Sequence, residues 1–430
     1  MILIYCNKIS PRLEYIFNHI LNLILNKKFS FTNSESEFSN FSGFKFSYAD
    51  KPISSELFFQ QVGLLYEKGL ENHEVKIFEW DDIKCFFRVD KKSAMPFDFF
   101  SASFFLLSRY EEYLPHKGNK KSQYKYHESI AFKENFIELP LIDIWIEKFK
   151  SILEEKLKIK FNNNKQISTI IISSLYPYKY INKYPFESLL IWFKNLINLN
   201  LWEVIEHFFV LFKIKMDPWQ IDQHLKELLL STNTRILFFF SFSSESYFKR
   251  ETPKTNHNFK KFIKEVYDNY QIGLIPSDKA SKKNKTLELE NKDISNLIHN
   301  KSDKILLREG LKKISQDYKP FFSLDYANDF SMGYKDILGY RASTSLPFFF
   351  YDLSNETKTN LYVTPFVVHF KLLNKMGTKD AIEKIQKLRE MTKKKYFNLC
   401  IILDNRLFEN SVKNKKRRLK FLSIIENLCK

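Results

Sequence analysis

Apolar runs of four to eight residues recur through the second half of the chain, and their spacing constrains the fold more than any other feature. Longer stretches with helical periodicity separate most of these runs. Apolar strands that alternate with helices form parallel sheets buried on both faces. The runs are ISTIIISS, RILFFFSF, QIGLIPS, LYVTPFVVHF and FNLCIILDN, and the helical stretches lie around 186–213, 217–231, 257–269 and 378–394. We therefore expect an α/β fold whose parallel sheet is either open or closed into a barrel.

The first 160 residues mix short strands and helices, which is typical of an α+β domain. The polar segment FNNNKQ at 161–166 predicts a linker after it. A chain of 430 residues exceeds the size at which one hydrophobic core usually keeps growing. We expect two domains, 1–160 and 167–430. The predicted elements of the first are a strand at 1–6, helices near 11–26, 54–69 and 97–113, and strands at KIFEW and CFFRV. In the second, the lysine- and serine-rich segment 278–303 predicts a solvated excursion with one short helix.

The stretch MPFDFFSASFFLLSRYEEYLP is the most distinctive of the first domain, because an apolar helix turns polar at its end. Arg109 and Glu112 stand three residues apart on one helical face and can form an ion pair. We interpret this mixed helix end as a contact that docks the two halves of the chain together.

The chain is basic, with 68 Lys and Arg against 50 Asp and Glu and a formal net charge of +18. Lys, Asn, Ile, Phe and Tyr are abundant while Gly numbers only 9, and those five abundant types share AT-rich codons. A nucleic-acid surface gathers its charge and carries arginine, whereas these lysines are spread along the chain. We therefore do not expect a nucleic-acid partner. The dense run KNKKRRLK at 413–420 predicts a solvated helix face, or a contact with phosphate or an anionic envelope polymer.

The four cysteines lie far apart and form no Cys-x-x-Cys pair, so neither a zinc ribbon nor a disulfide framework is indicated. The N-terminal segment lacks the charge order and the unbroken apolar stretch of a signal peptide. No segment reaches the length of a membrane span. We expect a reduced, cytoplasmic protein.

Candidate metal ligands are sparse. No two of the nine histidines stand three or four residues apart, which excludes a helical His pair. Ligands can still converge from the carboxyl ends of separate strands, where α/β proteins usually mount reacting groups. The first long strand of the second half ends in Ser173 and Ser174, two hydroxyls with no carboxylate.

Several segments, in this order, resemble the polysaccharide deacetylase family in its long bacterial form with an N-terminal domain of unknown role. The segments are MPFDFFSASFFLLSRYEEYLPH, YKY at 178–180, GLIPS at 273–277, NDFSMGY at 328–334, GYRASTSLPFFFYDL at 339–353 and ILDN at 402–405. The resemblance implies a distorted (β/α) barrel that holds one divalent metal such as zinc. A carboxylate would act as base on metal-bound water, and an N-acetyl group of an envelope glycan would be hydrolysed.

The family's catalytic roles fall on unsuitable residues of this chain. The resemblance places the paired aspartates of the first barrel strand at Ile171 and Ser173, the adjacent histidine at Ser174, and later histidines at Ile275 and Asp404. Isoleucine cannot bind a cation, and serine alone is a poor ligand. We expect no metal, no other cofactor and no activity by the family mechanism. The protein would then be retained as a scaffold that binds glycan or envelope polysaccharide, or it would be in the course of decay.

Four residues match the family and are expected near the same mouth: Asp329, Tyr334, Arg341 and Asn405. Asp329 and Arg341 can pair with one another or orient a substrate. Two alternatives to an inactive deacetylase-like protein stay open. One is an active carbohydrate hydrolase with a site built from Asp329, Arg341 and Asp404, and the other is a basic nucleic-acid-binding protein.

Overall fold

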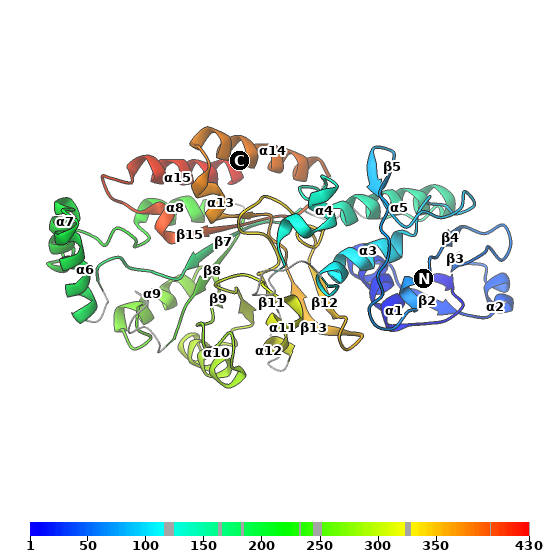
Figure 1. Cartoon of the computed structure of the whole chain (residues 1–430), viewed down its shortest axis with the longest axis horizontal. Helices are drawn as coiled ribbons and strands as arrows, with labels where there is room; N and C mark the ends of the chain where they lie inside the picture. Colours follow the sequence, from blue (N-terminus) through cyan, green and yellow to red (C-terminus); the bar gives the residue numbers. More distant parts are fainter. Residues whose placement is uncertain are drawn as a thin grey trace.

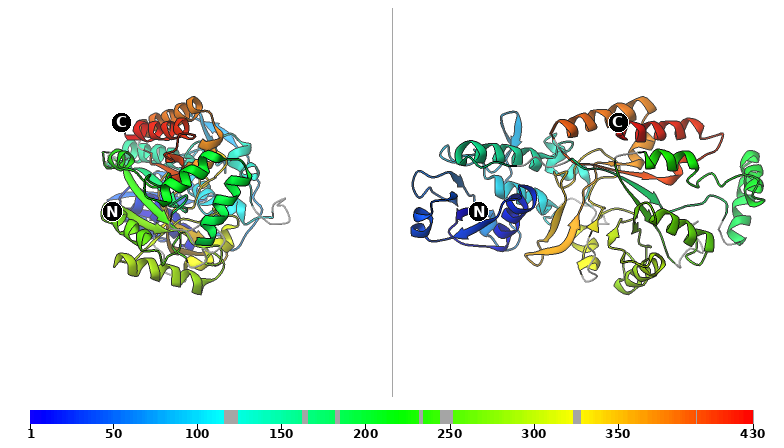
Figure 2. Two further views of the ribbon diagram at one scale, coloured as in Figure 1. Left: turned by 90° about the vertical axis from the view of Figure 1, so that its left-hand side faces the viewer. Right: turned by 180° about the vertical axis from the view of Figure 1, so that it is seen from behind.

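The computed structural model of the chain contains two main β-sheets, one in each half of the sequence (Figure 1). A four-stranded sheet belongs to the first 60 residues, and a nine-stranded sheet begins at Ser168. A helical hairpin lies at the opposite end of the molecule from the first sheet (Figure 2). The structure describes residues 1–115, 124–161, 166–181, 185–231, 234–243, 252–322, 328–395 and 397–429.

The N-terminal sheet is parallel, in the order β2-β1-β3-β4. Its strands are Ile2–Tyr5, Phe29–Thr32, Phe44–Ala49 and Phe58–Gln60 for β1 to β4. Helix α1 (Pro11–Phe17) begins where Ser10 caps the amide of Leu13 and proline occupies the first turn. It continues as a π-helix, Asn18–Ile24, close to the predicted end at 26. Helix α2 (Glu35–Asn40) packs beside β1.

The predicted helix near 54–69 is wrong. The chain instead forms a turn, strand β4 and a short 3-10 helix at Leu64–Tyr66. The carboxylate of Glu56 explains the turn, because it accepts hydrogen bonds from the backbone amides of Ile53 and Ser54 at 2.9 and 2.7 Å. Gly63 then adopts a left-handed conformation, with φ of 95°, which ends the extended segment.

Two helices form the centre of the N-terminal part. All nine residues of α3 (Phe99–Leu107) are buried, so this helix is surrounded on every side. Helix α5 (Leu141–Leu157) is amphipathic, and its Trp145 donates a hydrogen bond to the carbonyl of Lys84 at 3.1 Å. That bond ties α5 to the small antiparallel hairpin β5–β6 (Phe78–Trp80 and Ile83–Cys85). The strand predicted at KIFEW is thus present, whereas the one predicted at CFFRV is misplaced, because the observed strand ends at Cys85.

The second sheet has the order β12-β13-β11-β10-β9-β8-β7-β15-β14, and every neighbouring pair except β12 with β13 is parallel. Four of the five predicted strands are found at β7, β8, β9 and β15, whereas the run LYVTPFVVHF is divided between the end of β13 and β14. In chain order the strands are Ser168–Ser174 (β7), Arg235–Phe240 (β8), Gln271–Leu274 (β9), Lys304–Ile305 (β10), Asn328–Asp329 (β11), Phe348–Asp352 (β12), Thr357–Val363 (β13), Val368–His369 (β14) and Leu399–Asp404 (β15).

A closed barrel is not found. The edge strands β12 and β14 do not pair with one another in the described part of the chain. The segment between β13 and β14 nevertheless connects two distant parts of the sheet. The amide of Phe366 donates to Met332 O, after β11, and that of Val367 donates to Cys400 O, in β15, both at 3.0 Å. The fold is therefore a mixed α/β sheet with strong curvature.

Helices cover the outer face of the curved sheet. In Figure 1, α14 and α15 lie on one side of the strands, and α9 and α10 lie on the other. The segment expected to be a solvated excursion holds α10, whose Glu290 is buried and accepts a hydrogen bond from the amide of Ser277 at 3.0 Å. The covering helices are Gln223–Leu230 (α8), His257–Tyr267 (α9), Asn284–Ile298 (α10), Phe370–Lys375 (α13), Thr378–Lys395 (α14) and Lys415–Cys429 (α15).

The two parts of the chain meet through buried polar contacts. Glu112 follows α3 and accepts hydrogen bonds from Arg109 at 2.9 Å and from Arg341 at 2.9 and 2.6 Å. In α5, the Asp143 carboxylate accepts from the amide and hydroxyl of Ser345 at 2.8 and 2.6 Å. The interpretation of the polar end of α3 as a docking contact is therefore confirmed, and its partner is the GYRASTS segment.

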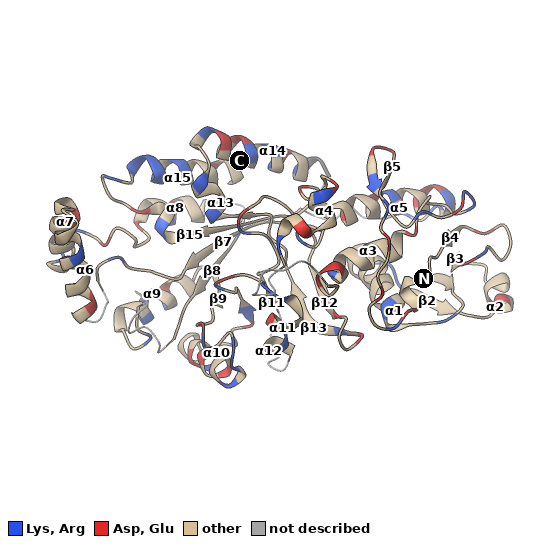
Figure 3. Cartoon of the chain, viewed as in Figure 1, with Lys and Arg blue, Asp and Glu red and all other residues tan. Residues whose placement is uncertain are grey.

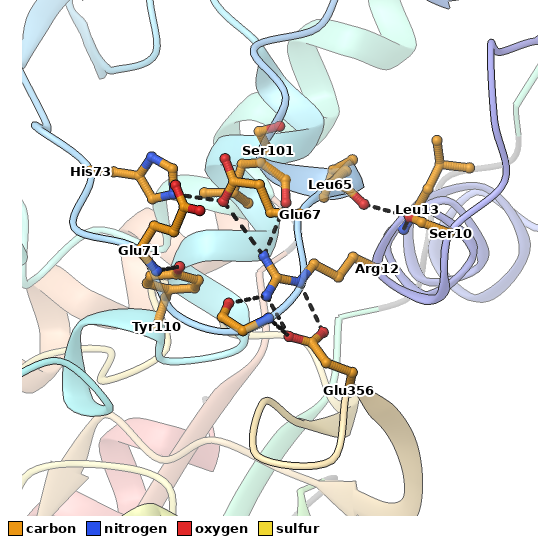
Figure 4. Close-up of polar contacts among 12 residues, drawn as sticks. Ser10, Arg12, Leu13, Leu65, Glu67, Glu71, His73, Ser101, Tyr110 and Glu356 are labelled. Carbon is orange, nitrogen blue, oxygen red and sulfur yellow. Dashed lines mark hydrogen bonds and ion pairs between the residues drawn. The ribbon is translucent and has the colours of Figure 1, made fainter.

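A third contact joins α1 to the turn between β12 and β13 (Figure 4). The guanidinium of Arg12, only 1% exposed, binds the Glu356 carboxylate, with Nε to Oε2 at 2.9 Å, and also donates to Leu64 O at 3.0 Å. The Glu356 carboxylate also accepts from the amide of Gly69 and the hydroxyl of Tyr351, both at 3.0 Å. The domain boundary at 161–166 stays a prediction, since residues 162–165 lie outside the described part of the chain.

Candidate functional site

A cavity of about 290 Å³ opens where the parallel strands of the larger sheet end. This is the edge at which open α/β sheets usually bind ligands. Seven strands, β7, β9, β10, β11, β13, β14 and β15, bring residues to it, either from near their ends or from the loops that follow. These residues include Ser173, Ile275, Leu306, Ser331, His369, Ile402 and Asp404.

The floor beneath the cavity is apolar. A separate cluster of buried side chains fills the concave face of the sheet. Phe239 and Phe330 meet there edge to face, with ring centroids 5.4 Å apart. The cluster consists of Ile171, Leu237, Phe239, Ile275, Leu306, Phe330, Phe366, Cys400 and Ile402. Ile171 and Ile275, two of the positions that the resemblance assigns to base and ligand, therefore belong to a packed hydrophobic core.

Asp404 lies at the end of β15 and is fully engaged. Its carboxylate accepts hydrogen bonds from Arg406 Nε at 2.7 Å, Arg406 Nη2 at 2.9 Å and the Arg406 amide at 3.0 Å. Burial alone lowers the pKa of Arg406, but the hydrogen bond and charge of Asp404 outweigh it, so this pKa is raised. The Arg406 guanidinium also lies over the Tyr176 ring, 4.8 Å from its centroid. The forked pair leaves Asp404 neither a free proton acceptor nor a free cation ligand.

Two nitrogen bases line the cavity. Burial lowers the pKa of Lys335 to about 7, helped by the charge of Lys371, and the Nζ atom donates to Arg308 O at 2.5 Å. Burial and the charges of Lys335 and Lys371 also hold the pKa of His369 well below its usual value. His369 Nδ1 accepts from the Lys371 amide at 3.2 Å. The cavity therefore carries a neutral imidazole and an amine whose charge changes near neutral pH.

The residues at the strand ends do not fit the divalent metal that the resemblance implies. Among the residues that the structure describes, no three His, Cys, Asp or Glu side chains lie close enough together to hold a cation. The carboxylate of Asp404 is neutralised by Arg406, and His369 lies beside Lys371 and beside Lys335, which becomes positively charged as pH falls below about 7. A divalent cation at this position would meet an apolar floor and neighbouring cations.

The four residues expected at one mouth do not gather there. Asp329 is buried beside the cavity, where Oδ2 accepts from the Tyr318 hydroxyl at 2.7 Å and the Ser331 amide at 3.0 Å. Arg341 binds Glu112, so the predicted Asp329–Arg341 pair is not formed. Tyr334 lies under the Arg341 guanidinium, 5.6 Å from ring centroid to Cζ.

Asn405 and Ser174 are buried and do not line the cavity. The Asn405 Nδ2 atom donates to the carbonyls of Tyr176 at 3.0 Å and Trp219 at 3.1 Å, which braces two loops. Ser174 is buried, and its Oγ has no hydrogen-bond partner in the described residues. Of the residues singled out from the sequence, only Ser173, Ile275 and Asp404 line the cavity.

Sequence reasoning missed the basic side chains of the cavity. His369 ends β14, and Arg406 follows β15 by two residues. Both therefore satisfy the rule that strand ends carry functional groups, and inspection of each apolar run for its next polar residue would have found them. Lys335 and Arg308 follow very short strands, which give no periodic signal.

The comparisons with known proteins give one family and several distant structural likenesses. Residues 2–158 match the profile of a family described as "Family of unknown function (DUF7033)", which covers less than half of the chain. No curated protein matches the sequence.

The solved structures that resemble the chain do so weakly. A presumed polysaccharide deacetylase from Mycobacterium smegmatis aligns with a TM-score of 0.37 and 8% identity, over 62% of this chain and 86% of its own. Puue allantoinase aligns with a TM-score of 0.33 and 10% identity, over 60% and 83%. A 4-alpha-glucanotransferase from Thermococcus litoralis aligns with a TM-score of 0.36 and 10% identity, over 62% of this chain and 37% of its own. Similarity at this level assigns no activity to the chain.

Proposed function

We propose that this protein is a deacetylase-like, catalytically inactive protein that binds a glycan at the strand ends of its larger sheet. One observation carries the proposal: Asp404 is locked in a fork with Arg406 above an apolar floor. A hydrolase of the family type needs a free carboxylate base and a metal at that place. The quoted sequence segments support the relationship, and the cavity supports retained binding.

The cavity lining favours a glycan that bears an acidic group. Tyr176 and Phe370 offer ring faces, and apolar faces with a few polar groups are typical of small-ligand sites. Arg308, Lys335 and Lys371 add positive charge on the same lining. A carboxylate on a sugar would find its counter-charge there.

The two alternative functions are less well supported. The hydrolase hypothesis needs Asp329, Arg341 and Asp404 at one site, but only Asp404 lines the cavity, and Arg341 is bound to Glu112. The nucleic-acid hypothesis needs gathered charge, whereas Figure 3 shows Lys and Arg on elements of both halves, interspersed with Asp and Glu.

Acetate release from an N-acetylglucosamine oligomer tests catalysis, and calorimetric titration of an acidic oligosaccharide tests binding. We expect no acetate above the blank, with or without added Zn²⁺, and saturable binding of the oligosaccharide. Arg406→Met should weaken that binding, whereas Asp336→Asn, at an exposed position outside the cavity lining, should not. Zinc-dependent acetate release would refute the proposed inactivity, and the absence of oligosaccharide binding would refute the proposed role.

We further propose a cytoplasmic location. Cys6, Cys85 and Cys400 are free and buried, in keeping with a reducing compartment. In the described residues, no helix is at once long and apolar enough to pass through a bilayer.

A further inference from the structure

A helical hairpin that carries an unusual number of exposed apolar side chains follows strand β7. It consists of α6 (Pro185–Ile197) and α7 (Leu201–Leu211), and Figure 2 shows it standing away from the body of the protein. Sixteen of the twenty-eight exposed large apolar residues of the described chain lie between Phe186 and Met216. Scattered exposed apolar residues are normal, but a contiguous patch of this size marks an interaction site.

The two most exposed apolar side chains of this segment lie at the tip of the hairpin. Ile197 and Leu199 are 79% and 81% exposed, and Trp202 is 58% exposed. Leu199 adopts a left-handed backbone conformation in the turn between the two helices, with φ of 54°. The tip thus presents its largest apolar side chains outward instead of folding them back onto the helices.

The polar side chains of α7 face the opposite way. Glu206 and His207 are buried, and Glu206 binds Lys215 and accepts a hydrogen bond from the Tyr180 hydroxyl at 3.3 Å. The His207 ring stacks on that of Tyr180, with centroids 4.5 Å apart. At 100° per residue, the exposed apolar positions from Leu201 to Phe212 span about 180° of the helix surface. Helix α7 therefore buries Glu206 and His207 together with Val210, and its outer side is apolar.

The charges around this face are positive. Between Phe186 and Met216 the exposed charged residues are Lys194 and Lys213, and no acidic side chain is exposed there. The basic run at 413–420 begins next to the hairpin, because Lys413 Nζ is 3.7 Å from Glu203 Oε1 of α7. Lys413, Lys415 and Lys416 are exposed, whereas Lys420 is buried and Arg418 binds Asp222. An apolar face rimmed by lysine, with a tryptophan at its tip, has the chemistry of a segment that lies in the interface of an anionic membrane.

We infer that the α6–α7 hairpin inserts its apolar face into the surface of a membrane that contains anionic lipids, with the exposed Lys413, Lys415 and Lys416 against the head groups. The helices have 13 and 11 residues, far short of the roughly 20 needed to span a bilayer. The hairpin would therefore lie in one leaflet. A second copy of the chain is the competing occupant, but a flat dimer contact would cover one side of the hairpin and would gain nothing from the lysine rim.

Vesicle flotation of the full chain tests this inference. Vesicles of phosphatidylcholine with about 30% phosphatidylglycerol are compared with pure phosphatidylcholine. We expect a bound fraction about tenfold larger on the anionic vesicles. The triple variant Ile197→Ser, Leu199→Ser, Trp202→Ser should lose about tenfold in binding, because three apolar anchors are removed. Leu289→Ser on α10, at a position 55% exposed, is the matched control and should bind as the native chain does.

A second pair of measurements separates the membrane from other occupants. Lys194→Glu with Lys213→Glu changes only exposed side chains and should reduce binding to the anionic vesicles without loss of helical circular dichroism. Light scattering after gel filtration reports the oligomeric state. The inference is overturned if the native chain does not float with anionic vesicles, if the triple variant floats equally well, or if the native chain is a dimer that the triple variant converts to monomer.

Discussion

Glu112 in the N-terminal part binds Arg341 in the C-terminal part through two hydrogen bonds, at 2.9 and 2.6 Å, and both side chains are buried. Arg109 donates a third bond to the same carboxylate. One acidic group thus binds two arginines from different parts of the chain, and Arg109 also pairs with Glu111 at 2.8 Å. The segments that resemble the deacetylase family, around 95–116 and 339–353, supply these residues. Part of their distinctive amino-acid sequence is therefore explained by the contact between the two parts of the chain.

The first prediction concerns this carboxylate. Glu112→Gln would leave the buried guanidinium of Arg341 without its counter-charge and that of Arg109 with Glu111 alone, and we expect a loss of about 3–5 kcal/mol in the free energy of unfolding. Urea denaturation measures it. Asp336→Asn is the control, since Asp336 pairs with Lys375 at 3.0 Å on the exposed surface and should cost less than about 1 kcal/mol. Equal effects of the two substitutions would contradict the role assigned to Glu112.

The second prediction concerns Asp329, whose burial raises its pKa to about 6. The folded protein holds this proton between about pH 4 and pH 6 while the unfolded chain releases it, so the contribution of Asp329 to stability falls as pH rises through that window. Asp329→Asn removes the titration. We expect the variant to gain on the order of 1–3 kcal/mol relative to the native chain between pH 4 and pH 8.

Thermal unfolding at several pH values checks this shift. Asp336→Asn, at an exposed position, again serves as the control. A stability difference between Asp329→Asn and the native chain that stays constant from pH 4 to pH 8 would count against a raised pKa at Asp329.

The third prediction concerns ligand binding at the cavity. Because the pKa of Lys335 is lowered to about 7, its positive charge is gained as pH falls from 8 to 6. An acidic oligosaccharide should therefore bind more tightly at pH 6, by up to about tenfold. Calorimetric titration at the two pH values measures the ratio. Lys335→Met should abolish the pH dependence, and Lys375→Met, at an exposed lysine outside the cavity lining, should preserve it.

The fourth prediction concerns the apolar floor. A Cβ atom at Gly273 would lie 2.4 Å from the Phe239 ring and 2.9 Å from Lys304 Cβ. Gly273→Ala should therefore cost about 1–3 kcal/mol through overpacking. Gly377→Ala is the control, since its Cβ would meet only the Asp380 side chain, at 3.2 Å. If denaturation midpoints of the two variants coincide, the concave core has more room than the structure shows.

The sequence predicted the long elements well and the short ones poorly. Strands β7, β8, β9 and β15 were predicted because continuous apolar runs are strong signals. Strands β10 and β11 have only two residues each, too few to show a hydrophobic periodicity. The predicted helix near 54–69 failed because carboxylate-to-amide bonds from Glu56 stabilise a turn that residue propensities do not report.

Of the residues singled out for the candidate site, few line the cavity. The strand-end rule led to Ser173 and the family resemblance led to Asp404, and both residues line it. Neither line of reasoning could show that Arg406 neutralises Asp404, or that Arg341 pairs with Glu112, 229 residues away. The choice of partner for a buried charge depends on how distant elements pack, and no local pattern records it.

The contacts Arg12–Glu356, Glu112–Arg341 and Asp143–Ser345 together have a consequence for folding cooperativity. Separation of the two parts of the chain would expose or orphan all three at once. A calorimetric scan should then show a single heat-absorption peak. Expression of 1–160 or 167–430 alone should yield a fragment whose former contact face carries charges without partners. Such a fragment should be prone to aggregation, even though the polar segment between the two ranges has the sequence of a linker.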